Sequence, residues 1–151
     1  MQYYDGALYV SGTYTSSKSE SLPVIYKVNV DGSGYKDVFH PRTSIYSFAI
    51  HRGALYVTYT DFTKSAGEYT DEEELETLGY GVLAYDMGNL SRPPRKVVEE
   101  TGCWGQVNTL IGFGNYLFIA AVVATQEYGE TGKLSSRQWS YNRLTKEIRA
   151  F

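Results

Sequence analysis

The sequence contains a single cysteine, Cys103, among its 151 residues. One thiol forms no disulfide within the chain, and it cannot supply a zinc site that needs four cysteine ligands. Positive charge is not in excess either, because 14 Lys and Arg stand against 17 Asp and Glu, for a net charge of −3. Nucleic-acid binding rests on basic surface, so this balance argues against a dedicated nucleic-acid-binding protein.

Long apolar runs are missing as well. The longest covers residues 117–124, only eight residues, whereas a membrane-spanning helix needs roughly 20. No basic segment leads into an apolar one at the N-terminus, so we expect neither a membrane span nor a signal peptide in this sequence. The compartment is left open by these observations.

Catalytic and cofactor signatures are absent from the sequence. The run GYGVLA (79–84) loosely fits a dinucleotide-binding pattern, but it leads into an expected strand rather than a helix. A Ser–His–acid triad would need His40 or His51, which we expect at opposite ends of the strands, and no G-x-S-x-G elbow is present. No base lies near Cys103 in the sequence to activate its thiol. We therefore predict no catalytic residue, no cofactor and no metal ligand.

Aromatic residues and a repeat are what the sequence does contain. Fifteen Tyr and six Phe favour strands, and fifteen Gly supply turns. The pentapeptide GALYV occurs at 6–10 and again at 53–57, and GNYLFIAAVVA (114–124) follows as a third, looser copy. Because the repeated strand would be buried on both faces, we expect its tyrosines to pack in the core rather than to stack on a ligand.

Further strands follow each copy in the same order. The segments VIYKVNV (24–30), VLAYDM (82–87) and RQWSYN (137–142) align with one another, and so do YKDVFH (35–40), RKVVEE (95–100) and KEIRAF (146–151). Strands also precede the second and third copies, at 44–50 and 107–113. Four strands per repeat predict an all-β fold of β-propeller blades, each with four antiparallel strands. A β-sandwich with accidental internal similarity is the alternative.

The repeats predict about three blades, at approximately 1–40, 44–100 and 107–151, within a single domain spanning 1–151. We expect the first blade to lack its first strand, since only MQYY precedes the first turn. A propeller typically needs four to eight blades to close. Either further blades from a longer chain or a homodimer would therefore complete the ring.

The run DGALYV…IYKVNVDGSGYKDVF resembles the blade repeat of TolB-like bacterial propellers and their relatives of unassigned function. The similarity is good over 5–39, looser over 52–99 and weak over 114–151, where the DGSG turn is replaced. These motifs specify a fold and carry no catalytic residues. The resemblance implies a scaffold for binding proteins or ligands, often outside the cytoplasm.

Long insertions gather at one end of the predicted strands, at 15–23, 61–81 and 125–137, and we expect this face to bind a partner. Seven acidic residues and one lysine occupy 61–79, and Thr70 and Glu73 fit the capping box of a short helix. Trp104 lies between two glycines in the neighbouring connection, either as a stacking platform or as a plug over the core. The candidate binding residues are Trp104, Asp71, Glu72, Glu73, Glu74 and Glu76.

The residues favour a non-enzymatic binding or scaffold domain that recognises a protein or carbohydrate through the face with the long loops. The alternative is an accessory or catalytic propeller domain of a hydrolase, with an acidic and metal-dependent site formed by the same loops. A purely structural subunit is a third reading. Neither the sequence nor the resemblance names the ligand.

Overall fold

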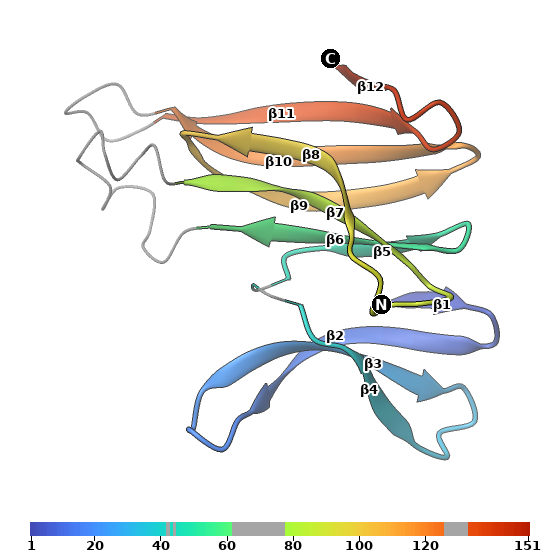
Figure 1. Cartoon of the computed structure of the whole chain (residues 1–151). Coiled ribbons are helices and arrows are strands. Elements are labelled where there is room, and N and C mark those ends of the chain that lie inside the picture. Colours follow the sequence, from blue (N-terminus) through green and yellow to red (C-terminus); the bar gives the residue numbers. More distant parts are fainter. Residues whose placement is uncertain (42, 44, 62–77, 126–132) are drawn as a thin grey trace. The chain divides into compact units, whose positions relative to one another are not determined.

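A computed structural model describes residues 1–41, 43, 45–61, 78–125 and 133–151 (Figure 1). Within these residues the chain forms twelve strands and no helix, so no helix there has the length and apolar character needed to cross a membrane. The chain divides into two compact units, Met1–Ile45 and Tyr46–Phe151. The predicted acid-rich helix around Thr70 lies outside the described residues.

The first unit is one antiparallel sheet in the order β1-β2-β3-β4. Its strands are β1 (Gln2–Tyr4), β2 (Ala7–Thr15), β3 (Ser21–Asn29) and β4 (Tyr35–Phe39). The prediction that this sheet lacks its first strand is wrong, because Gln2 pairs with Tyr9 and Tyr4 with Ala7. Three residues suffice for β1, since a two-residue turn folds it directly onto the longer β2.

The second unit contains two antiparallel sheets, each again in sequence order. One consists of β5 (Phe48–His51), β6 (Ala54–Thr60), β7 (Gly79–Asp86) and β8 (Arg95–Thr101). The other consists of β9 (Trp104–Phe113), β10 (Tyr116–Thr125), β11 (Lys133–Asn142) and β12 (Ile148–Ala150). The described chain is therefore all-β, with three sheets of four antiparallel strands, and none of these sheets is closed.

The strand registers confirm the repeat. The pairs that occupy matching positions are Val10 with Tyr26, Val57 with Leu83 and Ile119 with Trp139. One step further along are Leu8 with Val28, Leu55 with Tyr85 and Leu117 with Tyr141. The residues aligned in the sequence thus occupy equivalent positions in all three sheets.

An irregularity of the ladder recurs too. The register shifts between Ile25 and Tyr26 in the first sheet and between Val82 and Leu83 in the second. In each case one valine of the fourth strand, Val38 or Val97, is left over opposite the shift. Such β-bulges bend and twist a strand locally, so these two sheets share a shape as well as a strand order.

In the second unit the two sheets pack through β9, which contacts β5, β6 and β7. The core between them includes Tyr56, Val82, Val107, Leu117 and Ile119, all nearly inaccessible to solvent. β6 is buried on both faces, since Leu55, Tyr56 and Val57 are each at most 3% exposed. The expectation that the repeated tyrosines pack in the core is confirmed for Tyr9 and Tyr56, both of which are buried.

Tight turns join the first and second strands of each sheet, as the sequence predicts. Asp5 and Gly6 form the β1–β2 turn with φ of 45° and 80°, and Arg52 and Gly53 form the β5–β6 turn with φ of 48° and 79°. Positive φ at both central residues matches the twist of a hairpin. Arg52 therefore sits in a backbone conformation that favours glycine.

Candidate ligand-binding site

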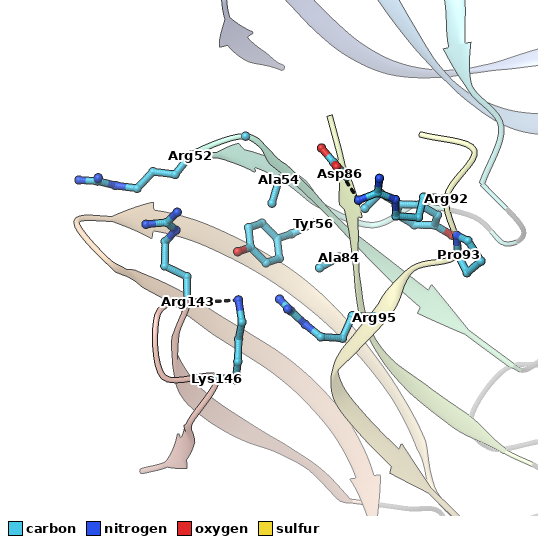
Figure 2. A pocket seen from close by; sticks show the side chains of 12 residues that line it. Arg52, Ala54, Tyr56, Ala84, Asp86, Arg92, Pro93, Arg95, Arg143 and Lys146 are labelled. Carbon is cyan, nitrogen blue, oxygen red and sulfur yellow. Dashed lines mark hydrogen bonds and ion pairs between the residues drawn. The ribbon is translucent and has the colours of Figure 1, made fainter. Parts of the chain in front are cut away.

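A pocket of about 320 Å³ lies at the tight-turn end of the second unit (Figure 2). The β5–β6 turn borders it from one sheet, and the β11–β12 turn borders it from the other (right-hand end of this unit in Figure 1). Its lining residues are Arg52, Gly53, Ala54, Tyr56, Ala84, Tyr85, Asp86, Arg92, Pro93, Arg95, Arg143 and Lys146. We call this cavity the basic pocket.

The lining of the basic pocket has five cationic side chains and one carboxylate. Arg92 pairs with that carboxylate, with 3.2 Å between its Nη1 and Oδ2 of Asp86. The other four cations, Arg52, Arg95, Arg143 and Lys146, have no carboxylate partner among the described residues. Uncompensated positive charge is thus concentrated in one cavity of a chain whose net charge is −3.

Arg95 is held in place by Tyr141, a buried residue next to the pocket lining. Its Nη2 donates a 2.6 Å hydrogen bond to the hydroxyl of Tyr141, and its guanidinium lies 5.7 Å from the centre of that ring. Tyr141 is buried and meets Tyr56 edge to face, with 6.3 Å between ring centroids. A guanidinium fixed by a cation–π contact and a hydrogen bond needs little reorganisation to accept a ligand.

Lys146 lies in the turn between β11 and β12, and its Nζ donates a 2.6 Å hydrogen bond to the carbonyl of Arg143. Partial desolvation, and then the charges of Arg95 and Arg143, lower the pKa of the Lys146 ammonium from its ordinary value. Figure 2 shows the side chains of Arg95, Arg143 and Lys146 converging around Tyr56. Their like charges repel one another.

The same surroundings shift the pKa values of Tyr56 and Tyr141. Burial is the main cause that raises the pKa of both Tyr56 and Tyr141, and the charges of Arg95 and Arg143 oppose the shift. Both hydroxyls therefore stay protonated at neutral pH. With cations and neutral hydroxyl groups but no free carboxylate, the basic pocket can hold an anion.

The predicted site residues lie elsewhere. Trp104 begins β9 and pairs with Ala124, at the end opposite the tight turns, as expected from the alternation of connections. Its side chain is half-buried, and its Nε1 is inaccessible to solvent. Asp71, Glu72, Glu73, Glu74 and Glu76 lie outside the described residues, so the acidic site, and with it the hydrolase reading, stays a prediction.

Cys103 precedes Trp104 and is half-buried. Burial, and then the negative charge of Glu100, raise the pKa of its thiol, although Arg137 acts in the opposite direction. A raised pKa disfavours the thiolate that a nucleophile requires, in line with the sequence. Within the described residues, no group of three or more His, Cys, Asp and Glu side chains is arranged to hold a metal ion.

His51 has a structural role. Its Nε2 lies 2.8 Å from the carbonyl oxygen of Gly114, and its ring covers Gly112 so closely that a Cβ there would clash. His40 lies in the other unit, near Asp37 and edge to face with Tyr14. Neither histidine lines the basic pocket.

The basic pocket lies at the tight-turn end of the strands, whereas the sequence predicts a binding face at the opposite end, where the long insertions gather. The signal was present in three short segments that carry the cations, HRGA (51–54), SRPPRK (91–96) and NRLTK (142–146). Each segment alone reads as an ordinary polar turn. Strand pairing within each sheet, together with packing of the two sheets against each other, brings the three segments to one end of the unit.

Compared with known proteins, the chain matches no protein-family model, and no curated protein matches its sequence. The resemblance to TolB-like propeller repeats therefore stays a prediction. What can be said about function rests on the geometry of the pocket.

Proposed function

We propose that the chain is a non-enzymatic binding domain of propeller type, and that the protein or carbohydrate it recognises presents negative charge to the basic pocket. The observation that carries this proposal is the set of four cationic side chains without a carboxylate partner in one cavity. Clustered like charges are unfavourable in a folded protein. A ligand of opposite charge removes that cost, which is the physical reason for binding there.

The surroundings of the cations support binding over catalysis. Arg95 is fixed by Tyr141, and Lys146 by the carbonyl of Arg143, so both groups are positioned before a ligand arrives. Tyr56, which lines the pocket, adds apolar ring surface beside the charges. Cations next to aromatic surface suit a ligand that has an anionic group on an apolar or sugar body.

The propeller assignment belongs to this proposal. Two four-stranded sheets pack face to face in the second unit, and the first sheet repeats their register and one β-bulge. The sheet β9–β12 exposes Ile111, Phe113, Tyr116 and Phe118. An exposed apolar face of this kind marks a surface that another chain or domain buries. We propose that a second copy of the chain, or further blades of a longer chain, supplies that cover.

The long-loop face remains a second contact surface in this proposal, with Trp104 as its described residue. The two surfaces lie at opposite ends of the strands of the second unit. A large ligand can contact either surface. Variants at the basic pocket and at Trp104 therefore show which of the two surfaces it contacts.

Binding to matched acidic and neutral probes tests the proposal. The acidic probes are an oligoglutamate peptide and a uronic-acid oligosaccharide, and the neutral ones are an oligoglutamine peptide and a maltooligosaccharide. We expect saturable binding of at least one acidic probe, weakened by at least about tenfold, or about 1.4 kcal/mol, in the double variant Arg143→Gln, Lys146→Gln.

The matched control is Lys96→Gln. Lys96 follows Arg95 in β8 but does not line the pocket, and this variant should bind like the unmodified chain. Equal binding of acidic and neutral probes, or equal losses in Lys96→Gln and in the double variant, would show that the pocket is not the ligand site.

A further inference from the structure

We propose that the group anchored in the basic pocket is a tetrahedral dianion, such as a phosphate or sulfate monoester, held between the two sheets of the second unit. This inference rests on the proposed function, because it specifies the chemistry of the same site. The origin, number and direction of the cations favour such a group over a single carboxylate.

The cations come from both sheets. Arg52 belongs to the β5–β6 turn and Arg95 begins β8, whereas Arg143 and Lys146 belong to the β11–β12 turn. An anion bound among them therefore contacts both sheets at once. These sheets already meet through the apolar core around β9 and through the hydrogen bond from Arg95 to Tyr141, and the anion adds a further polar link at the edge of that core.

The number of charges favours a dianion. Arg92 and Asp86 neutralise each other, and the side chain of Arg52 points away from Tyr56 (Figure 2), which leaves three cations around one space, Arg95, Arg143 and Lys146. A carboxylate would leave two of those charges uncompensated, whereas a phosphate or sulfate group leaves one and offers more acceptor oxygens. Charge-assisted hydrogen bonds to phosphate-type oxygens are among the strongest that arginine makes.

The directions of the donors favour a tetrahedral group over a planar one. One Nη of Arg95 is engaged by Tyr141, and its remaining N–H groups are free to donate. Arg143 and Lys146 approach the space around Tyr56 from the other sheet (Figure 2). Donors on opposite sides match oxygens that point in several directions, whereas a carboxylate presents its two oxygens in one plane.

Anion titrations test the inference. Isothermal titration calorimetry at constant ionic strength compares sodium sulfate, glucose 6-phosphate, O-phosphoserine and sodium acetate. We expect sulfate and at least one phosphate ester to bind saturably at one site, at least about tenfold more tightly than acetate. The double variant Arg143→Gln, Lys146→Gln should lose most of this binding, and Lys96→Gln should keep it.

The pH dependence isolates the charge of the ligand. A phosphate monoester has a second pKa of about 6, so lowering the pH from about 7.5 to about 5 converts it to a monoanion, while sulfate stays a dianion. The charged groups of the lining are Arg52, Asp86, Arg92, Arg95, Arg143 and Lys146, besides the tyrosines, and no histidine lines the pocket. Phosphate esters should therefore weaken by about tenfold at the lower pH, and sulfate should not.

The outcomes separate this inference from the proposed function. If the acidic polymers bind at the pocket but acetate equals sulfate, the dianion inference is wrong and the proposed function stands. If no anion and no acidic polymer binds, both fail. If glucose 6-phosphate binds more tightly than O-phosphoserine, the group belongs to a sugar, and the reverse order assigns it to a protein side chain. If sulfate and both phosphate esters fail to bind, the inference is wrong.

Discussion

At the scale of single residues, the basic pocket contains two side chains held on an unfavourable backbone. Arg52 and Lys146 have φ of 48° and 64°, in the left-handed region where a residue other than glycine is destabilised by about 1–2 kcal/mol. Asn or Gly would suit both turns better. Each of these cations therefore occupies its position at a cost in folding stability.

Replacing Lys146 by glycine should separate stability from binding. We expect Lys146→Gly to unfold at a higher denaturant concentration than Lys146→Gln, by about 0.5–1 kcal/mol, because glycine relieves the left-handed strain that glutamine retains. Both variants should bind sulfate several-fold more weakly than the unmodified chain. Chemical denaturation and calorimetry measure the two effects. A Lys146→Gly variant less stable than Lys146→Gln would show that the turn is not strained.

The lowered pKa of Lys146 predicts a pH effect on stability. The folded environment disfavours the charged ammonium, so the charged Lys146 destabilises the fold at pH values below the lowered pKa. This destabilisation disappears as pH rises through that pKa toward the ordinary value of 10.5. The stability of the unmodified chain relative to Lys146→Gln should therefore increase with pH over that interval. Saturating sulfate should abolish the increase. A difference that stays constant with pH would contradict the shift.

At the scale of elements, β9 carries the contact between the two sheets of the second unit, and glycines make this contact possible. A Cβ on Gly105 would collide with the ring of Tyr80, and one on Gly112 would collide with His51. Tyr80 is fully buried, so its ring cannot move aside into solvent. Absence of a side chain at these two points lets β9 lie against the neighbouring sheet.

Substituting Gly105 by alanine should therefore destabilise the fold. Overpacking of this kind typically costs about 1–3 kcal/mol, and we expect the midpoint of urea denaturation to fall accordingly. Gly102→Ala is not a clean control, because Gly102 has a φ of 74°. Thr109→Ala serves instead, since Thr109 is an exposed residue of the same strand and should change stability little. Equal effects of the two substitutions would place the sheet contact elsewhere.

Much of this element structure can be predicted from the sequence. The repeated GALYV pentapeptide and the aligned strands predict the four-stranded sheets and the residues that occupy equivalent positions in them, because alternation and turn chemistry are local. The short strand β1 was not predicted, because three residues are too few to show the alternation that identifies a strand. The basic pocket escaped prediction as well, because Arg52, Arg95 and Lys146 are far apart in the sequence and meet only once the strands pair within each sheet and the two sheets pack together.

At the scale of the whole molecule, one face of the sheet β9–β12 is apolar and exposed to solvent in the described chain. Phe113 is 76% exposed and pairs in register with Tyr116, and Tyr116 stacks on Phe118 with 6.3 Å between ring centroids. Ile111 lies opposite Phe118 on the same face. Contiguous apolar side chains of this kind mark a surface that associates.

Self-association through this face is the corresponding prediction. We expect the mass of the chain in solution, measured by light scattering, to rise above that of one copy as the concentration increases. The double variant Phe113→Ser, Phe118→Ser should return it to one copy, because it removes apolar area without touching the buried core. Association that persists unchanged in this variant would assign the contact to another surface.

The proposed function requires the tight-turn end of the second unit to bind an anionic ligand. A sulfate titration of ¹⁵N-labelled chain at constant ionic strength, followed by backbone amide shifts, tests this binding. We expect saturable shifts confined to the segments around Arg52, Arg95 and Arg143–Lys146, which disappear in the double variant Arg143→Gln, Lys146→Gln. Small, unsaturable shifts spread over the surface, or shifts centred on Trp104, would contradict it.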